Sequence, residues 1–404
     1  MRLKNKEINT IAVVAYYITA LTIGMLSDNV VLTALFYAIF IGGAVFKIAE
    51  TRLLNGLMLI VSCGGLACGI VGLLVNGNIQ ILNFTYMAFG IWIAMMIMDS
   101  RIDNRIFMYL CYSTALVIAG IILKKGLSPS GNFFVESSVN YISVFLMLSL
   151  CVYYARADLY NKRYSLIPAG VSLVLSFVAG GRGGFLSIAI LFFPLFLIKF
   201  YEKKRGLKEK TIMTIFLLMM IIIVAYPLFL KILSSDSNYA LIENFKNKAN
   251  LKNSYRYFCW QEYVDSCKNN WEYLLFGAKL EGLKWVDTLY GNLHNSFLFT
   301  HAYYGILGFA FVIIQSLKSG LFSIRNKKWV YMFSLLSFEV RAFTDHVFAA
   351  NRITPIFLAL LLAPEMLGLA KKYDLDNSSA GESLADLSVK LIHRYEGGQN
   401  HEVL

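Results

Sequence analysis

The sequence predicts an all-α integral membrane protein with about twelve transmembrane helices. Hydrophobic residues make up 57% of the 404 residues, and the mean hydropathy of +0.59 is far above that of ordinary soluble domains. The apolar residues are gathered in segments of about 20 residues, the length at which a helix crosses about 30 Å of hydrocarbon. Polar and mostly short connections separate these segments, which indicates a chain that crosses the bilayer repeatedly.

Twelve segments are apolar and long enough to be candidate transmembrane helices. We retain the first as a helix because it is long for a signal peptide and no small-residue cleavage pattern follows it. The candidate spans are 8–26, 30–49, 53–75, 79–98, 106–123, 141–155, 164–179, 185–201, 211–231, 296–316, 329–344 and 351–370.

The connections divide the chain into four parts. Residues 1–231 hold the first nine predicted spans, residues 296–372 hold the last three, and residues 373–404 form a polar tail. Between them, residues 232–295 form a single long loop. Loops of this length usually carry function.

The distribution of lysine and arginine predicts the orientation. These residues fall on alternate connections, which share a side with both termini, so we expect both termini to be cytoplasmic. The opposite connections SDN and NGN carry no basic residue, and only Lys124 and Lys125 run against the trend. The long loop is therefore predicted outside the inner membrane, in the periplasm. The net charge of +12 follows from this topology and gives no reason to expect a nucleic-acid partner.

Part of the long loop has the spacing of an amphipathic helix. In SYRYFCWQEYVDSCK the apolar residues predicted to share one face are Tyr257, Trp260, Val264 and Cys267. Cys259 and Cys267 are eight positions apart. On one helix that is about 12 Å, too far for a disulfide. A disulfide would require that this segment is not helical.

An arginine stands between two pairs of glycines in VAGGRGGFLS, residues 178–187. The topology places Arg182 in a tight outer turn between the seventh and eighth spans. Gly181 and Gly183 let the backbone turn sharply and approach a ligand closely. The alternative is an arginine that snorkels at a helix end.

Two further clusters lie on the outer side. One is at the start of the predicted helix in the long loop, and the other is at the end of that loop. Arg256 opens the predicted loop helix, although it could also be a solvated residue at a helix start. His294 and Asn295 lie in GNLHNSF, where the chain re-enters the membrane.

A last outer cluster is the turn EVRAFTDHVFAANR between the final two spans. It contains Arg341, Asp345 and Arg352. Arg341 and Asp345 are four residues apart, so an alternative is that they only pair with each other on a helix. Charged residues near membrane depth usually mark a pathway or a site.

Several arginines and a histidine on one side of a membrane suit an anion with many oxygens. Guanidinium groups bind phosphate oxygens in bidentate fashion, so they can hold a diphosphate and stabilise it as a leaving group without a metal. No carboxylate cluster with metal-ligand spacing occurs in the outer loops, and no cofactor is expected. A histidine near neutrality can accept a proton from a sugar hydroxyl. The chemistry this predicts is glycosyl transfer from a lipid diphosphate.

The chain resembles the bacterial O-antigen ligases and the O-antigen or capsular polysaccharide polymerases over residues 165–365. The resemblance is carried by GGRGGFLSI, by SYRYFCW with the later LLFGAKL, by LHNSFLFTHAYYGILGF and by TDHVFAANR. It implies a helical transferase of the GT-C type that uses an undecaprenyl-diphosphate-linked glycan as donor on the periplasmic face.

The resemblance also implies roles for individual residues. Arg182 and Arg256 would contact the donor diphosphate, with His294 as general base. In the last turn Asp345 would be catalytic, and Arg341 or Arg352 would be the matching basic residue. The first six spans show no motif of this family.

The family divides by acceptor, and we expect a polymerase that joins lipid-linked repeat units. The alternatives are a ligase that moves the glycan onto lipid A core, and a flippase for lipid-linked glycans. Against a flippase stand the long outer loop, the absence of similarity between the two halves of the chain, and charges confined to one face. A chain-length regulator is a further candidate partner beside the lipid-linked glycan and the bilayer.

Overall fold

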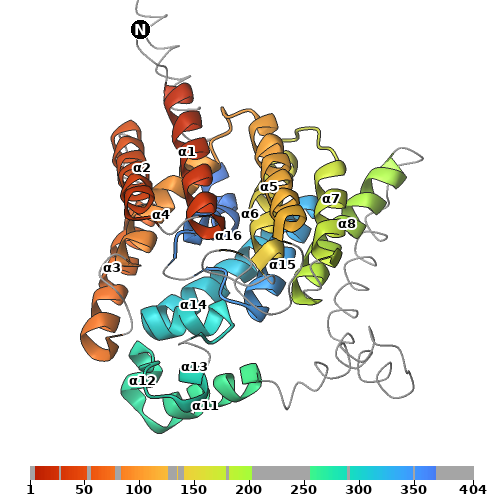
Figure 1. Cartoon of the computed structure of the whole chain (residues 1–404). Coiled ribbons are helices and arrows are strands. Elements are labelled where there is room, and N and C mark those ends of the chain that lie inside the picture. The colour runs from red at the N-terminus through yellow and green to blue at the C-terminus, as the bar shows by residue number, and fades with distance from the viewer. Residues whose placement is uncertain are drawn as a thin grey trace, which may run out of the picture.

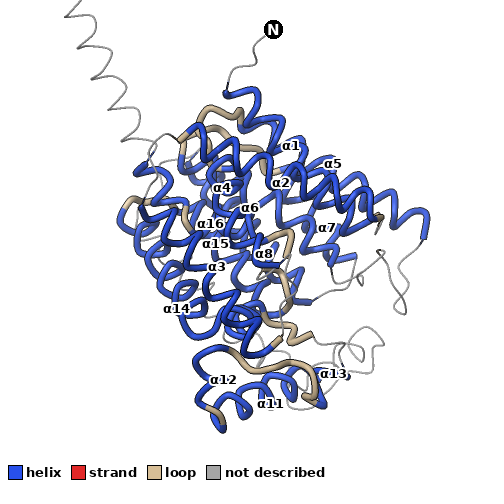
Figure 2. The backbone as a smooth tube through the Cα atoms, turned by 90° about the vertical axis from the view of Figure 1, so that its left-hand side faces the viewer, coloured by secondary structure: helices blue, strands red, loops and turns tan. Residues whose placement is uncertain are grey.

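The computed structural model describes residues 5–26, 29–51, 56–77, 83–125, 134, 141–178, 182–202, 255–288, 292–348 and 351–369. All regular structure within these residues is helical (Figures 1 and 2). The predicted all-α class is therefore confirmed.

Eight of the described helices precede the long loop. They are α1 (Asn5–Met25), α2 (Val30–Glu50), α3 (Gly56–Asn76), α4 (Asn83–Ile97), α5 (Asn104–Lys125), α6 (Tyr141–Leu159), α7 (Ile167–Val178) and α8 (Arg182–Glu202). The loop contributes α11 (Tyr255–Asn269), α12 (Trp271–Phe276) and α13 (Lys284–Thr288). They are followed by α14 (Ser296–Arg325), α15 (Trp329–Thr344) and α16 (Thr354–Leu361).

Seven of the described helices are long and apolar enough to cross a membrane, which makes the chain a multi-pass membrane protein. They are α1, α2, α3, α5, α6, α8 and α14. The predicted number of twelve is not reached within the described residues, and the predicted span 211–231 lies outside them.

Helices α7 and α16 are shorter than the predicted spans 164–179 and 351–370, whereas α15 has the predicted bounds 329–344. Helix α4 covers most of the predicted span 79–98, of which residues 79–82 lie outside the described part of the chain. Hydropathy counts apolar residues but does not locate the first helical backbone position. Pro168 and Pro355 each lie in the first turn of their helix, where proline is tolerated because its missing N–H needs no partner. The apolar residues that precede them were counted into the predicted spans but lie in connections.

Helix α6 forms the centre of the bundle. In its most apolar window 94% of the residues are buried, and it packs against α5 and α15. Elsewhere in the bundle, α8 packs on α15, α16 packs on α4, and α14 packs on α3 (Figure 1). Because α6 is buried on all sides it has no polar face, and its two charged residues, Arg156 and Asp158, lie in its last turn.

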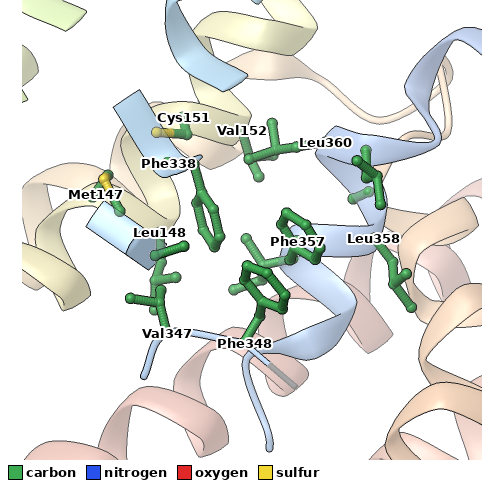
Figure 3. Packing of buried hydrophobic residues seen from close by; sticks show 14 of the residues in the cluster. Met147, Leu148, Cys151, Val152, Phe338, Val347, Phe348, Phe357, Leu358 and Leu360 are labelled. Atoms are coloured by element: carbon green, nitrogen blue, oxygen red, sulfur yellow. The ribbon is translucent and has the colours of Figure 1, made fainter. Parts of the chain in front are cut away.

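Aromatic rings fill the core between α6, α15 and α16 (Figure 3). The Phe348 ring stacks on Phe357 with centroids 3.7 Å apart, and Phe357 stacks on Phe338 at 5.4 Å. Phe348 belongs to the connection between α15 and α16. Its burial therefore fixes the turn in which Asp345 lies.

The helices α11, α12 and α13 lie together at one end of the bundle, which we call the loop end (Figures 1 and 2). Helix α1 begins at the other end, which we call the basal end. Helix α12 packs on the first part of α14, and α11 packs on α12 and α13.

Helix α14 is broken at Gly305, which was predicted to lie within a continuous span. Gly305 has φ 63° and ψ −166°, a conformation that side chains other than glycine rarely adopt. A Cβ on Gly305 would overlap the Leu275 carbonyl of α12, and a Cβ on Gly277, with φ 90°, would overlap the His301 carbonyl of α14. The two glycines therefore permit backbone-to-backbone contact between the loop helices and α14.

Candidate active site

At the loop end a histidine, an aspartate and an arginine form a continuous chain of contacts. His294 Nδ1 lies 3.1 Å from Asp345 Oδ1, and Arg341 Nη2 donates to Asp345 Oδ2 at 2.9 Å. The Asp345 side chain is 2% exposed, whereas that of His294 is 21% exposed. The aspartate is thus enclosed while the imidazole reaches the surface of the site.

The surrounding cations keep Asp345 ionised. Burial by itself would raise its pKa, but the charge on Arg341, the hydrogen bond and charge of His294 and the charge on Arg256 hold the pKa well below its usual range. A carboxylate only accepts hydrogen bonds, so the proton of a neutral His294 lies on Nδ1. Its Nε2 then carries a lone pair.

The local backbone explains how His294 reaches this position. His294 has φ 48°, which turns the chain sharply just before α14 begins. Asn295 caps that helix, since its Oδ1 accepts from the backbone N–H groups of Phe297 and Leu298 at 3.0 and 3.1 Å. The Asn295 side-chain oxygen is therefore occupied by the helix start.

Ser296 joins the histidine segment to the turn that carries Asp345. Its hydroxyl donates to the Asp345 carbonyl at 2.8 Å and accepts from the Val347 N–H at 2.7 Å. Because Ser296 is buried, these bonds are shielded from water. The pairing of His294 with Asp345 is thus held by backbone contacts as well as by the side chains.

Arg256, near the start of α11, reaches across to the end of α15. Its Nη1 donates to the Thr344 carbonyl at 2.7 Å. Burial lowers the pKa of Arg256, with Asp345 acting to raise it and Arg341 to lower it further. The loop helix therefore delivers an arginine to the same small region as Asp345.

The glycine-flanked segment also meets this region. Arg182 is the first residue of α8, and a Cβ on Gly183 would lie 2.8 Å from Thr344 Oγ1. A Cβ on Gly184 would overlap the Ser143 side chain of α6. Gly183 and Gly184 thus let α8 pack closely against α15 and α6, whereas the sequence suggested ligand approach. Gly181 lies outside the described residues.

Arg341 and Arg352 occupy different surroundings. The Arg341 side chain is 3% exposed, and its Nη1 also donates to Thr344 Oγ1 at 3.0 Å. The carbonyl of Arg352 accepts from the Tyr16 hydroxyl of α1 at 2.6 Å. Arg341 is therefore enclosed beside Asp345, and the backbone of Arg352 contacts α1.

The loop helix α11 is confirmed, but its buried face differs from the predicted one. Tyr257 and Val264 are 42% and 37% exposed, while Cys259, Tyr263 and Cys267 are buried. Both cysteines are free on this single helix, as the predicted separation requires. The face shifted because Tyr263 packs against α14, a contact that hydropathy does not encode.

Three residues that sequence reasoning did not assign to the site hold the loop helices in place. Tyr263 Oη lies 2.7 Å from His301 Nδ1, and His301 Nε2 lies 2.8 Å from the Leu274 carbonyl. A carbonyl only accepts, so Nε2–H donates to Leu274 and Nδ1 accepts from Tyr263. Trp260 Nε1 donates to the Leu293 carbonyl at 2.6 Å, next to His294. The only sequence signal for the role of His301 was the run of polar and aromatic residues in LHNSFLFTHAYYGILGF.

The fold and this site define a class: a helical multi-pass membrane protein with a buried aspartate, a partly exposed histidine and arginines at one end of the bundle. Residues 164–313 match the family model described as O-Antigen ligase. This match supports the similarity to O-antigen ligases and polymerases that the sequence motifs indicated. The match covers α7, α8, α11 and His294, whereas Arg341 and Asp345 lie beyond it. No curated protein matches the chain at a significant level of similarity.

Proposed function

We propose that the protein is a metal-independent glycosyltransferase that moves a glycan from an undecaprenyl diphosphate carrier to a sugar hydroxyl. The observation that carries the proposal is the contact between His294 Nδ1 and Asp345 Oδ1 at 3.1 Å. It leaves Nε2 of a partly exposed imidazole as a proton acceptor. Arginines lie beside this imidazole. The family model that the chain matches is described as O-Antigen ligase.

In the proposed step the acceptor hydroxyl oxygen attacks the anomeric carbon of the donor glycan. The bond from that carbon to the diphosphate oxygen breaks, and undecaprenyl diphosphate leaves. The hydroxyl proton passes to His294 Nε2. Asp345 holds the Nδ1 proton and stabilises the imidazolium that forms, so it orients the base and does not itself accept the proton.

The diphosphate needs cations that reach the site. We assign this role to Arg182 at the start of α8 and to Arg256, which places one guanidinium nitrogen on Thr344 and has further donors. Arg341 is too enclosed for direct contact with the donor, so we assign it to Asp345 and Thr344. Arg352 remains a candidate for binding the diphosphate on the resemblance alone, and its carbonyl contacts Tyr16 of α1.

We propose a polymerase, in which the acceptor is another lipid-linked repeat unit. The second candidate is a ligase acting on lipid A core, since the matched family covers both activities. Deletion of the gene separates the two on gels of surface polysaccharide. Loss of a polymerase leaves single repeat units on the core, whereas loss of a ligase leaves long chains on the carrier lipid.

The proposal places the loop end in the periplasm and both termini in the cytoplasm. Asn269 is exposed at the end of α11, and Arg325 is exposed at the end of α14. Cysteine at position 269 should react with an impermeant reagent in intact spheroplasts, and cysteine at position 325 should not. The wild-type chain gives the background of its six native cysteines. The opposite labelling pattern would place the site on the cytoplasmic face.

The direct test is transfer from a purified undecaprenyl-diphosphate glycan by the protein in nanodiscs. His294→Ala should lower the rate by about 10²–10⁴-fold, the usual range for a positioned general base. The matched control is His393→Ala in the tail. His301 is unsuitable as a control because it holds the loop helices. Near-normal transfer by a folded His294→Ala protein would refute the proposed base.

A further inference from the structure

A basic cavity lies at the basal end of the bundle. Its volume is about 440 Å³, and it opens between the start of α5, the connection from α6 to α7, and the end of α8. The charged and amide side chains that line it are Asp103, Asn104, Arg105, Lys162, Arg163 and Lys199. The 21 residues of α8 span about 30 Å, and this length separates the cavity at the end of α8 from Arg182 at its start.

The cavity carries four cations against one carboxylate. Arg105, Lys162, Arg163 and Lys199 are all exposed, so their charged ends can reach a ligand. The Asp103 carboxylate already accepts from the backbone N–H of Arg105 at 2.9 Å, where it caps α5. The lining therefore favours an anion.

The wall of the cavity also offers an acceptor. Asn104 is 8% exposed, and its amide nitrogen donates to the Tyr153 carbonyl at 3.3 Å. Its Oδ1 is buried and finds no hydrogen-bond partner among the described residues. Buried polar atoms usually have a partner, and this oxygen suits a hydroxyl group. A ligand with both phosphate and hydroxyl groups matches the lining.

Helix α8, which brings Lys199 to the cavity, also exposes a stripe of apolar side chains. Phe193, Phe196 and Phe200 of α8 are 44%, 45% and 48% exposed, and their spacing of three and four places them on one face. The rings of Phe196 and Phe200 stack with centroids 6.1 Å apart. Lys199 follows Phe196 by three residues, so a cation lies beside this apolar stripe, where its Nζ donates to the Tyr164 carbonyl at 2.6 Å.

We propose that this cavity binds the head group of an anionic phospholipid, with its acyl chains along the phenylalanine stripe of α8. The cations hold the phosphodiester, and Asn104 Oδ1 accepts from a head-group hydroxyl. Cationic clusters where a helix leaves the bilayer attract anionic lipids of the adjacent leaflet. A soluble phosphate compound would use the cations but not the apolar stripe.

The test is native mass spectrometry of the full-length chain in detergent, with phosphatidylglycerol and phosphatidylcholine of the same acyl chains as probes. Phosphatidylglycerol should be retained preferentially. Arg105→Gln combined with Arg163→Gln should weaken its retention roughly ten- to thirtyfold, the scale expected for two basic residues near a membrane surface. The matched control removes two exposed cations where α14 ends, Arg325→Gln with Lys327→Gln, and should retain the lipid as the wild type does.

Three results would overturn the proposal. These are equal retention of the two lipids, equal losses in the cavity and control variants, or full competition by millimolar inorganic phosphate, which would define a site for soluble anions. A second variant, Phe196→Ala with Phe200→Ala, changes no charge and should weaken phosphatidylglycerol binding. No measurement uses a glycan donor, so the outcome is independent of the proposed transferase activity.

Discussion

The two ends of the bundle each bury an aspartate among cations, yet they do so in different ways. At the basal end, Asp99 accepts from Arg101 Nε at 2.8 Å and from Asn9 Nδ2 at 2.7 Å, and Lys47 lies 3.6 Å away. At the loop end, Asp345 pairs with Arg341 and with His294. Both carboxylates are strongly paired, so a buried aspartate with an arginine does not by itself identify a site.

The two aspartates differ in the kind of residue with which each one pairs. The partners of Asp99 belong to α1, α2 and the connection that follows α4, and they join these segments. Arg156 of α6 adds to the same junction by donating to the Asp99 carbonyl at 3.0 Å. Asp345 instead orients an imidazole that is 21% exposed. The first arrangement suits a structural junction, and the second suits proton transfer.

The sharpest test of this difference compares Asp345→Asn with Asp99→Asn. Each change removes one buried charge and should destabilise the protein. In Asp345→Asn the new amide can donate to Nδ1 and thereby move the histidine proton to Nε2, so transfer should fall by about 10²–10⁴-fold. Folded Asp99→Asn protein should keep its specific activity within a few-fold. Equal losses of activity would remove the distinction between the two aspartates.

A smaller effect is expected for the arginines of the two ends. If Arg182 holds a diphosphate, Arg182→Lys keeps the charge but loses the planar fork, and transfer should fall roughly 10- to 100-fold, with Arg182→Ala lower still. Arg101→Lys should affect stability only, since its partners are Asp99 and Glu50. Rates are measured in nanodiscs with folding checked by thermal unfolding. Full activity in Arg182→Lys would instead indicate snorkelling.

The glycines that follow Arg182 allow a test on packing alone. Gly184→Ala places a Cβ against Ser143 and should destabilise the protein by about 1–3 kcal/mol, the usual cost of overpacking. Ser143→Gly in the same chain should recover part of the loss. Gly120→Ala in α5 is the matched control, because its Cβ would meet no described atom within 4 Å. Thermal unfolding in detergent measures all four proteins, and unchanged stability in Gly184→Ala would contradict this account of the glycine.

The smallest expected effect is a difference in acid sensitivity. Burial would raise the pKa of Asp99, but Arg101 and Lys47 lower it to about 2. A depressed folded pKa means that the pairing stabilises the protein above the unfolded value of about 4 and that this contribution is lost as the pH falls toward 2. The stability gap between wild type and Asp99→Asn should therefore shrink between pH 4 and pH 2. The corresponding gap for Asp345→Asn should persist to lower pH, because the pKa of Asp345 lies lower still.

The sequence by itself determined the helical membrane class, the similarity to O-antigen ligases and polymerases, and the set of polar residues available for the candidate site. Hydropathy and charge are local properties, and the family motifs are short, so they can be read without contacts. The helix of the long loop and the free state of Cys259 and Cys267 also followed from local spacing. The lengths of α7 and α16 did not, because proline and turn residues shorten helices inside apolar runs.

Only the tertiary structure decided how those polar residues are paired. His294 and Asp345 are 51 positions apart, and their contact depends on how α14 and α15 pack at the loop end. The same packing encloses Arg341, uses Gly183 and Gly184 for helix contact, and breaks α14 at Gly305. Sequence patterns specify which side chains are available on one face of a helix. The distances between faces of different helices come from the packing of the whole bundle, where side-chain volume decides the register.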